Sequence, residues 1–524
     1  MYTPHFTIPD LDRLLDSFTF PDTFYFGCST AGYQVEGGFN GREEPKNNWY
    51  YFEQTRRAAP TGSCVRFLDL YEQDLARARW IGLNSFRLGL EWSRLQPGVD
   101  PDLTQPPAFS RDAVQDYTRI MAAVYNQGMF PVVTLHHFTH PLWAGLDFWQ
   151  RRDDVLELFP QYVEFAVREI NELLIKQYQH PPISHFITIN EPFVVPLAAY
   201  FLHNFPRGRL KGMSAVRQCY ENLLTAHVLA YRLVHRIYRE HDWPRPTITI
   251  NPWCAGCYSM DKLSQDLLLA RQNDVTRNHL EPWLQKQRIQ FKSFIKKIPH
   301  VSGPNVMKHW LNNLLDYWLQ KNIGPQAMLH LLELIHQGDD PQLLDAVSFD
   351  FYDPIPANYF QFGFPPVFSS KPWQWNVVPH YLGAFLQSYS TTSLDLPIYI
   401  MENGMSFRHD GQRAYQRRDK ATRDAVLKAM MFELVAALNK GINLTGYYYW
   451  SLLDNYEWGS FEPRFGLFGI DYFHQAKRLE TDICGTNAAG AYKLFVEAFR
   501  ERDLNLLRQA FMTTQYPVLK LNSQ

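Results

Sequence analysis

The stretch ISHFITINEP, residues 183–192, decides the fold. Residues 183–190 form a short apolar run rich in β-branched and aromatic side chains, which is typical of a buried strand. Segments with helical periodicity lie on both sides of it, over residues 155–177 and 215–240. A strand alternating with helices predicts a βα unit of a parallel sheet.

The same alternation recurs along most of the chain. Seven further runs predict strands at 24–29, 85–90, 131–137, 247–252, 346–352, 397–402 and 444–450, and further helices are expected at 71–81 and 423–440. Eight parallel strands are the number that closes a (β/α)8 TIM barrel. We therefore predict an α/β fold in which residues 1–524 form one barrel domain with long βα loops. A doubly wound open sheet is the alternative, but no glycine-rich phosphate turn follows an early strand.

The connection between the fifth and sixth predicted strands is unusually long. Residues 258–344 indicate a helical insertion of several helices. Five basic residues, Lys286, Arg288, Lys292, Lys296 and Lys297, alternate there with apolar and aromatic ones. We interpret them as the solvated basic face of an amphipathic helix, and keep a lid over an apolar aglycone or a peripheral membrane contact as the alternative.

Composition excludes several classes of protein. Of the 524 residues 46% are hydrophobic and 20% charged, with a net charge of −2, so we expect a globular protein that does not bind nucleic acid. No window reaches the ~18 apolar residues of a transmembrane segment, and the N-terminus has no signal-peptide pattern. The six cysteines include one CxxC, Cys254 and Cys257, which is weak evidence for zinc. A cytoplasmic location fits best.

Two predicted strands end in glutamate. The fourth runs into Asn190 and Glu191, and the seventh into Glu402. The carboxyl ends of barrel strands meet at one face, so both glutamates can point into one cleft. Hydrolysis of a glycosidic bond requires two such carboxyl groups, one protonated and one ionised. Either glutamate alone would more often be a buried, paired structural residue.

Ordered motifs over nearly the whole chain then add a resemblance. They are FGCSTAGYQVEG at 26–37, NSFRLGLEWSR at 84–94, VTLHH at 133–137, TINEP at 188–192, YIMENG at 399–404 and GYYYWSLLDNYEWGSFEPRFGLFGIDY at 446–472. Together they resemble glycoside hydrolase family 1, the β-glucosidase and β-galactosidase group. The resemblance implies a retaining β-glycosidase, most simply a β-glucosidase, that needs no cofactor and no metal and acts on a small-molecule β-glycoside.

The resemblance also implies roles for individual residues. Glu191 would be the general acid/base and Glu402 the nucleophile, and the other catalytic residues would be Arg87, Asn190 and Tyr352. Substrate contacts fall to Gln34, His137, Asn190, Trp450, Glu457, Trp458 and Phe465. A carboxylate at Glu457 would repel a sugar 6-phosphate, and Arg464 is the only cation in Pro463–Phe465, so we expect an unphosphorylated sugar.

Several positions depart from the family pattern. Phe138 stands in place of the usual Trp, which removes an indole donor, and Asp350 stands in place of the usual Asn, which adds a carboxyl group near the dyad. Phe351 and Met401 also differ, and the loop 458–464 is one residue shorter. Two other functions stay open: a transglycosidase that passes the sugar to an alcohol or lipid acceptor, and a sugar-binding protein without activity.

Overall fold

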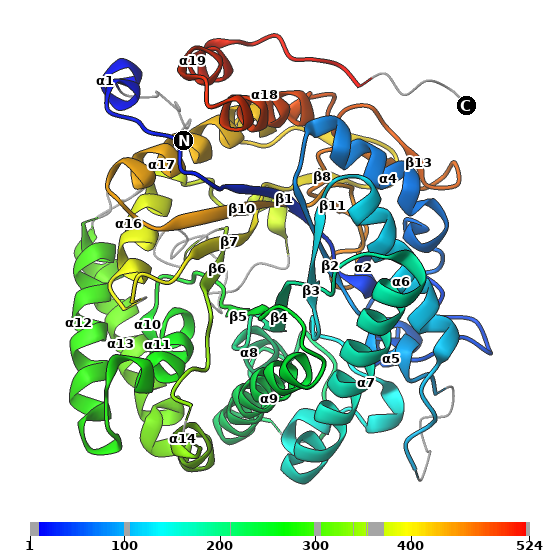
Figure 1. Ribbon diagram of the computed structural model, residues 1–524, viewed down its shortest axis with the longest axis vertical. Helices are drawn as coiled ribbons and strands as arrows, with labels where there is room; N and C mark the ends of the chain where they lie inside the picture. Colours follow the sequence, from blue (N-terminus) through cyan, green and yellow to red (C-terminus); the bar gives the residue numbers. More distant parts are fainter. Residues whose placement is uncertain are drawn as a thin grey trace.

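Eight parallel strands form a barrel at the centre of the molecule, with the main helices around it (Figure 1). The computed structural model describes residues 10–98, 105–209, 211–297, 305–338, 340–352, 354, 371–392 and 394–519. The barrel strands are β1 (Tyr25–Ser29), β2 (Ser85–Gly89), β3 (Phe130–Thr134), β4 (His185–Asn190), β5 (Thr247–Asn251), β6 (Val347–Phe351), β7 (Ile398–Asn403) and β10 (Leu444–Trp450). Their order in the sheet is β5-β4-β3-β2-β1-β10-β7-β6.

The two outer strands of that order, β5 and β6, are themselves joined. Backbone amides of Asp345, Asp350 and Cys254 donate to the carbonyls of Ile248 (3.0 Å), Pro252 (2.9 Å) and Asp350 (2.9 Å) respectively. These bonds close the sheet on itself. The predicted (β/α)8 barrel is confirmed, and the open doubly wound sheet is wrong.

Each barrel strand is followed by at least one helix that packs on its outside. Seven of these are α4 (Phe67–Ile81), α6 (Arg111–Asn126), α7 (Arg152–Tyr178), α9 (Met213–Glu240), α16 (Pro379–Ser390), α17 (Arg423–Asn439) and α18 (Ala488–Glu501). Ser110 caps α6 by accepting from the amide of Ala113 (3.2 Å), and Asp153 and Asp154 in the first turn of α7 suit the positive end of its dipole.

Smaller elements complete the chain. The short helices are α1 (Leu11–Asp16), α2 (Gly32–Val35), α3 (Tyr50–Gln54), α5 (Trp92–Leu95), α8 (Val194–Tyr200) and α19 (Leu504–Met512), and the short strands are β8 (Phe407–His409), β9 (Ala414–Tyr415), β11 (Pro463–Arg464), β12 (Ile470–Asp471) and β13 (Lys477–Arg478). The eight predicted strands match the barrel strands with small shifts at their ends. The largest is at β3, which ends at Thr134 because residues 135–137 already turn into the loop that follows.

The connection between β5 and β6 is helical, as predicted. It contains α10 (Tyr258–Asp261), α11 (Leu263–Leu269), α12 (Leu280–Lys296), α13 (Asn305–Ile323) and α14 (Leu329–His336). Among the described residues, no helix is long and apolar enough to cross a membrane.

The expectation of a solvated basic face on α12 is wrong in part. Arg288 is buried and its Nε donates to Asp316 of α13 (2.7 Å), and Lys292 pairs with the same carboxylate (2.8 Å). These cations face the neighbouring helix because Asp316 lies buried there, whereas Lys286, Lys296 and Lys297 are exposed. Basic residues at this spacing therefore serve both packing and solvation.

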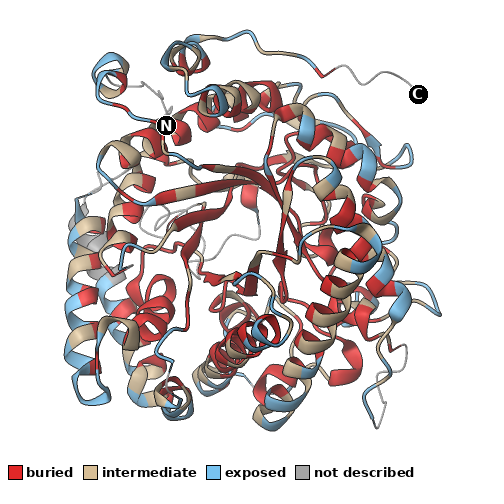
Figure 2. Ribbon diagram, in the orientation of Figure 1, coloured by how far each residue is buried: buried red, intermediate tan, exposed pale blue. Residues whose placement is uncertain are grey.

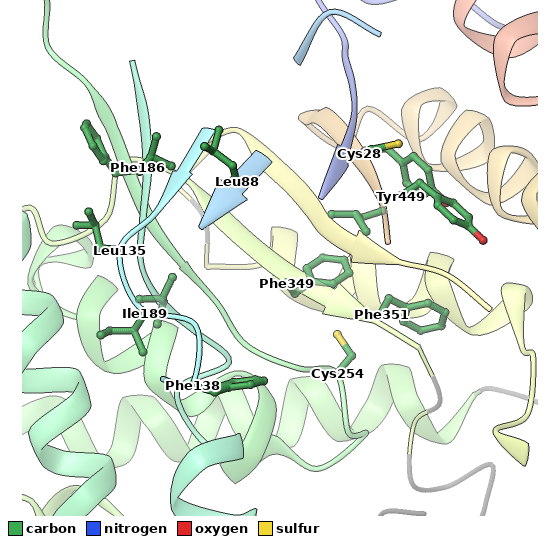
Figure 3. Packing of buried hydrophobic residues seen from close by; sticks show 14 of the residues in the cluster. Cys28, Leu88, Leu135, Phe138, Phe186, Ile189, Cys254, Phe349, Phe351 and Tyr449 are labelled. Carbon is green, nitrogen blue, oxygen red and sulfur yellow. The ribbon is translucent and has the colours of Figure 1, made fainter. Parts of the chain in front are cut away.

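Buried residues concentrate on the strands and on the inner sides of the helices (Figure 2). One large cluster, which includes Phe186 and Phe349, fills the layer between strands and helices (Figure 3). A separate cluster contains Val132 of β3 and Met401 of β7, which can only meet across the inside of the barrel. The barrel is thus a packed scaffold, and its carboxyl-terminal end is free to hold a site.

Candidate active site

A cavity of about 230 Å³ opens at the carboxyl ends of the barrel strands. Eight of the expected site residues line it: His137, Glu191, Tyr352, Glu402, Trp450, Glu457, Trp458 and Phe465. The other three, Gln34, Arg87 and Asn190, lie behind this lining and are almost completely buried. The structure therefore brings together residues that are hundreds of positions apart in the chain.

Glu402, at the end of β7, is held by two donors. Arg87 of β2 is fully buried and its Nη1 lies 2.6 Å from Oε1 of Glu402. The hydroxyl of Tyr352 donates to the other carboxylate oxygen at 2.9 Å. Charge-assisted bonds of this kind favour the ionised form of a carboxyl group. Glu402 is therefore placed as an anion.

Arg87 also orders the neighbouring strands. Its Nη2 donates to Oδ1 of Asn190 (2.6 Å), and its Nε donates to the hydroxyl of Thr134 (2.9 Å). Nδ2 of Asn251, at the end of β5, donates both to Asn190 (2.7 Å) and to Oδ2 of Asp350 (2.5 Å). One network of hydrogen bonds thus joins the ends of six strands, β2 to β7.

Glu191 follows β4 directly and differs from Glu402 in its surroundings. It is buried, and no described residue donates a hydrogen bond to its carboxyl group. One carboxyl oxygen from each of Glu191, Asp350 and Glu402 lies within 4.8 Å of the other two. Such a short separation fits the ~5 Å spacing of a retaining pair rather than the wider spacing of an inverting one.

These surroundings separate the two glutamates electrostatically. Burial, and next the negative charge of Glu402, raise the pKa of Glu191 well above its usual range. Burial also raises the pKa of Glu402, but Arg87 and Tyr352 oppose that effect. Glu191 is therefore the group that keeps a proton near neutral pH, and Glu402 the group that loses it.

Asp350 adds a third carboxyl group to the pair. It is fully buried, and burial followed by the charges of Glu402 and Glu191 raises its pKa well above the usual range. Its Oδ1 has no hydrogen-bond partner among the described residues. Three carboxyl groups this close could coordinate a cation, but the guanidinium of Arg87 already contacts Glu402 and would repel one.

Aromatic rings form the side of the cavity next to Glu402. The ring of His137 stacks on Trp450 and on Trp458, with centroids 5.7 Å apart in both cases. Burial lowers the pKa of His137 well below its usual value, so its imidazole is neutral. Its Nδ1 is buried without a partner among the described residues and can bond a ligand hydroxyl. Flat rings and such donors suit a sugar.

The surroundings of Glu457 weaken the repulsion of a sugar 6-phosphate that the sequence led us to expect from its carboxylate. Nε1 of Trp450 donates to its Oε1 (2.9 Å), and burial raises its pKa to about 8. Glu457 is then mostly neutral at pH 7, so it repels a phosphate less than an ionised carboxylate would. Gln34 lies nearby, where its Nε2 donates to Asn455 (3.2 Å) and its Oε1 is buried without a partner among the described residues.

Phe138, which departs from the family pattern, and Arg464, the one cation of Pro463–Phe465, both have a structural role. Phe138 is buried and contacts the rings of Trp458 (4.9 Å) and Phe205 (5.6 Å), so it extends the apolar lining of the cavity. Arg464 is buried, where its Nη1 lies 3.3 Å from Asp454 and its guanidinium lies over Tyr472. Arg464 is therefore engaged away from the cavity, whose described lining includes no Lys or Arg.

Backbone conformation at the cavity is unusual. Glu191 (φ 41°), Phe138 (φ 68°) and Trp458 (φ 41°) all adopt the left-handed region, which non-glycine residues rarely occupy. Each such residue costs about 1–3 kcal/mol, and residues of this kind cluster at functional sites. All three strained residues line the cavity that the expected site residues form.

Sequence reasoning missed several residues of the site. Asn251 joins Asn190 to Asp350, and its place at the end of a predicted strand was the signal that could have identified it. Trp253 and Trp375 line the cavity from loops, and Val194, Leu197 and Ala198 line it from α8. Cys254 and Cys257 are free and buried and contact different residues, Tyr389 and Asp316, so they form no disulfide.

Known proteins share this chain's sequence pattern over most of its length. The profile of "Glycosyl hydrolase family 1" matches residues 16–285 and 354–483. A 6-phospho-β-galactosidase of Streptococcus pneumoniae is 25% identical over 498 residues, which covers 88% of this chain and 96% of that protein. β-Glucosidase A of Acetivibrio thermocellus is 26% identical over 476 residues, covering 87% and 95% respectively.

Solved structures agree on the fold. A β-glucosidase from Thermotoga maritima, solved with galacto-hydroximolactam, superimposes with a TM-score of 0.65 at 20% identity. The alignment covers 92% of this chain and 99% of that one. At 20% identity this similarity supports the architecture alone. The two relatives named above differ in substrate by their names, since one is a 6-phospho-β-galactosidase and the other a β-glucosidase.

Proposed function

Because the chain belongs to glycosyl hydrolase family 1 and is a β-glycosidase of that family, we propose that it is a retaining enzyme that hydrolyses unphosphorylated β-D-glycosides, with β-glucosides preferred. One observation carries the proposal. Arg87 and Tyr352 donate to the carboxylate of Glu402. A carboxyl oxygen of Glu191 lies within 4.8 Å of a carboxyl oxygen of Glu402, and no described residue donates a hydrogen bond to the carboxyl group of Glu191. An anion thus faces a protonated acid across a short gap.

In the first step, an oxygen of Glu402 attacks the anomeric carbon of the sugar. The bond between that carbon and the leaving oxygen breaks, and the proton of Glu191 moves to the leaving oxygen. Loss of the charge on Glu402 removes one cause of the raised pKa of Glu191, so Glu191 becomes a base. In the second step, water gives a proton to Glu191 and displaces Glu402 from the sugar.

The lining of the cavity supports an unphosphorylated sugar. A 6-phosphate carries a strong negative charge and needs cationic or several neutral donors. Arg464 is paired with Asp454, His137 is neutral, and the described lining includes no Lys or Arg. Neutral donors and acceptors around Trp450 suit hydroxyl groups instead.

Azide trapping tests the roles of the two glutamates through opposite products. In Glu402→Ala, azide should attack the anomeric carbon directly and give an α-glycosyl azide from an activated aryl β-glycoside. In Glu191→Ala, the same substrate should still form the covalent intermediate, and azide should release a β-glycosyl azide. Hydrolysis of unactivated glycosides should fall roughly 10²–10⁴-fold in Glu191→Ala.

Identical azide products from the two variants, or unchanged hydrolysis by either, would overturn the assignment of roles. Substrate class is tested separately, by comparing kcat/KM for 4-nitrophenyl β-D-glucoside, β-D-galactoside and their 6-phosphates. We expect the glucoside to be cleaved best and the phosphates worst. Preference for a 6-phosphate would contradict the unphosphorylated assignment and leave the dyad intact.

Transfer to an alcohol is a second candidate, favoured by the apolar residues beside Glu191. Val194, Leu197 and Ala198 line the cavity where the acceptor must enter. An alcohol bound there could take the sugar in place of water, with the same proton transfer to Glu191. Mass spectrometry of products formed with hexanol present should reveal hexyl glucoside if transfer competes with hydrolysis; free glucose alone would argue against it.

A further inference from the structure

The cavity wall next to Glu191 is formed by one continuous piece of chain. Three residues of α8, Val194, Leu197 and Ala198, and two residues after it, Leu202 and Phe205, line the cavity; we call these five the apolar wall. Val194, Leu197 and Ala198 have the i, i+3, i+4 spacing that places side chains on one helix face. The apolar wall begins three residues after Glu191.

This position relates the apolar wall to the leaving group. In the proposed function, Glu191 protonates the oxygen that joins the sugar to its aglycone, so the aglycone starts at Glu191 and points away from Trp450. The amide of Val194 bonds the carbonyl of Glu191 (2.9 Å), which fixes α8 directly beside the acid. Whatever leaves the sugar must therefore contact the apolar wall.

We propose that the natural aglycone is an aliphatic alcohol, with an alkyl chain that packs along the apolar wall. This inference rests on the proposed glycosidase function and narrows its substrate to alkyl or lipid-like β-glycosides. Val, Leu and Ala side chains offer dispersion contacts along a chain but no hydrogen bonds. Phe205 continues the surface through ring contacts with Phe138 (5.6 Å) and Trp458 (5.6 Å).

A second sugar fits this place poorly. Its hydroxyl groups would lose their water against the apolar wall, and a hydroxyl group buried without a hydrogen-bond partner weakens binding. Asn204 carries the only side-chain amide among the described residues of segment 194–205 that line the cavity. One amide cannot satisfy the several hydroxyl groups of a glucose ring, so the wall disfavours oligosaccharides.

Exposed aromatic residues lie next to the apolar wall in the chain. Phe201, between α8 and Leu202, is 45% exposed, and its ring contacts that of Trp318 on α13 (5.8 Å). Trp318 is 40% exposed, and Tyr317 and Leu314 beside it are exposed as well. An alkyl chain longer than the cavity can leave over the Phe201 and Trp318 rings without exposing all of its length to water.

A chain-length series tests the proposal. We would measure kcat/KM for n-alkyl β-D-glucosides from methyl to dodecyl, below the concentrations at which they form micelles, with cellobiose as the polar comparison. Each methylene that becomes buried should raise kcat/KM by up to roughly 4-fold. The rise should level off once the chain leaves the cavity, and octyl glucoside should exceed cellobiose by at least about 100-fold.

Two variants locate the effect on the apolar wall. Leu197→Asn keeps the side-chain size but adds an amide, and Val194→Thr keeps the shape but adds a hydroxyl; the second serves if the first does not fold. Both should reduce the ratio of octyl to methyl kcat/KM by about 10-fold or more. Leu329→Asn, at a 52% exposed position on α14 outside the cavity lining, is the matched control and should leave the ratio unchanged.

The outcomes separate this inference from the proposed function. Cleavage of methyl glucoside and cellobiose with no gain from longer chains would overturn the aliphatic aglycone and leave the glycosidase intact. An unchanged ratio in both wall variants would overturn the apolar wall as its site. Failure to cleave any β-glycoside would instead overturn the proposed function itself.

Discussion

At the scale of single side chains, the site holds one guanidinium against three buried carboxyl groups. Arg87 forms its ion pair with Glu402, so its positive charge stabilises the ionised forms of Glu191 and Asp350 less. A protonated Asp350 has the same pattern as the Asn usual in the family, because one oxygen accepts from Asn251 and the other carries a hydrogen. The departure at this position is then conservative as long as the proton stays bound.

The first prediction concerns this proton. The raised pKa of Asp350 means that the folded protein binds a proton that the unfolded chain releases above about pH 4. Wild-type stability should therefore fall with rising pH relative to Asp350→Asn, by ~1.4 kcal/mol for each pH unit until the folded pKa is reached. The pH-dependent part of the difference should vanish near pH 3, where Asp350 is protonated in both the folded and the unfolded state.

Denaturant unfolding of both proteins at pH 3, 5 and 7 measures the effect. Glu191 and Glu402 titrate in both proteins, so their contributions largely cancel in the difference. A stability difference that is the same at all three pH values would mean that Asp350 is ionised in the folded protein.

At the scale of elements, the strands were predictable and the loops were not. Glu191 and Glu402 could be placed from the sequence because each directly follows or ends an apolar strand, whose period and length are local properties. The contact of Asn251 with Asp350 depends on how β5 and β6 are aligned where the barrel closes, and the apolar wall depends on how α8 packs at the barrel end. No local sequence pattern encodes either arrangement. The left-handed backbone of Glu191 and Phe138 was equally hidden, since such residues rarely adopt it.

The second prediction concerns the junction of β7 and β10. A Cβ atom on Gly404 would lie 2.0 Å from the carbonyl oxygen of Trp450, so Gly404→Ala must push the two strand ends apart. Glu402 and Trp450 would then separate, and a displacement near 1 Å costs roughly 100-fold in kcat/KM. Steady-state kinetics and thermal unfolding measure both effects.

Gly128→Ala provides the matched control. Gly128 has φ +76° and open space around its Cβ position, so alanine there adds about 1–2 kcal/mol of backbone strain without moving the site. We expect a lower melting temperature with unchanged kcat/KM. Equal kinetics in both variants would show that β7 and β10 tolerate the added atom.

At the scale of the whole molecule, buried ion pairs join distant parts of the chain. Asp74 of α4 accepts from Nε (2.8 Å) and Nη2 (2.7 Å) of Arg478 on β13, and both residues are buried. Arg423 and Asp482 form a second fully buried pair, at 3.1 Å. The first pair joins positions 404 residues apart in the chain, and the second joins positions 59 residues apart.

The third prediction follows from the first of these pairs. Asp74→Ala leaves Arg478 buried without its partner and should reduce the free energy of unfolding by about 3–5 kcal/mol. Asp22→Ala removes a fully exposed partner of Arg502 and should produce no measurable change. Urea denaturation compares the two variants; equal effects would show that burial of the first pair adds nothing.

The pairing of β1 with β10 has a consequence for how the protein is made. β1 is the first barrel strand to be synthesised and β10 the last, and Tyr25 stands beside Gly446 in the finished sheet. A nascent chain that has not yet reached β10 presents unpaired edges on β1 and β7, which are templates for aggregation. Both glutamates are translated before Trp450. The growing chain therefore contains its catalytic carboxyl groups early, but the complete site can form only after the final strand has been synthesised.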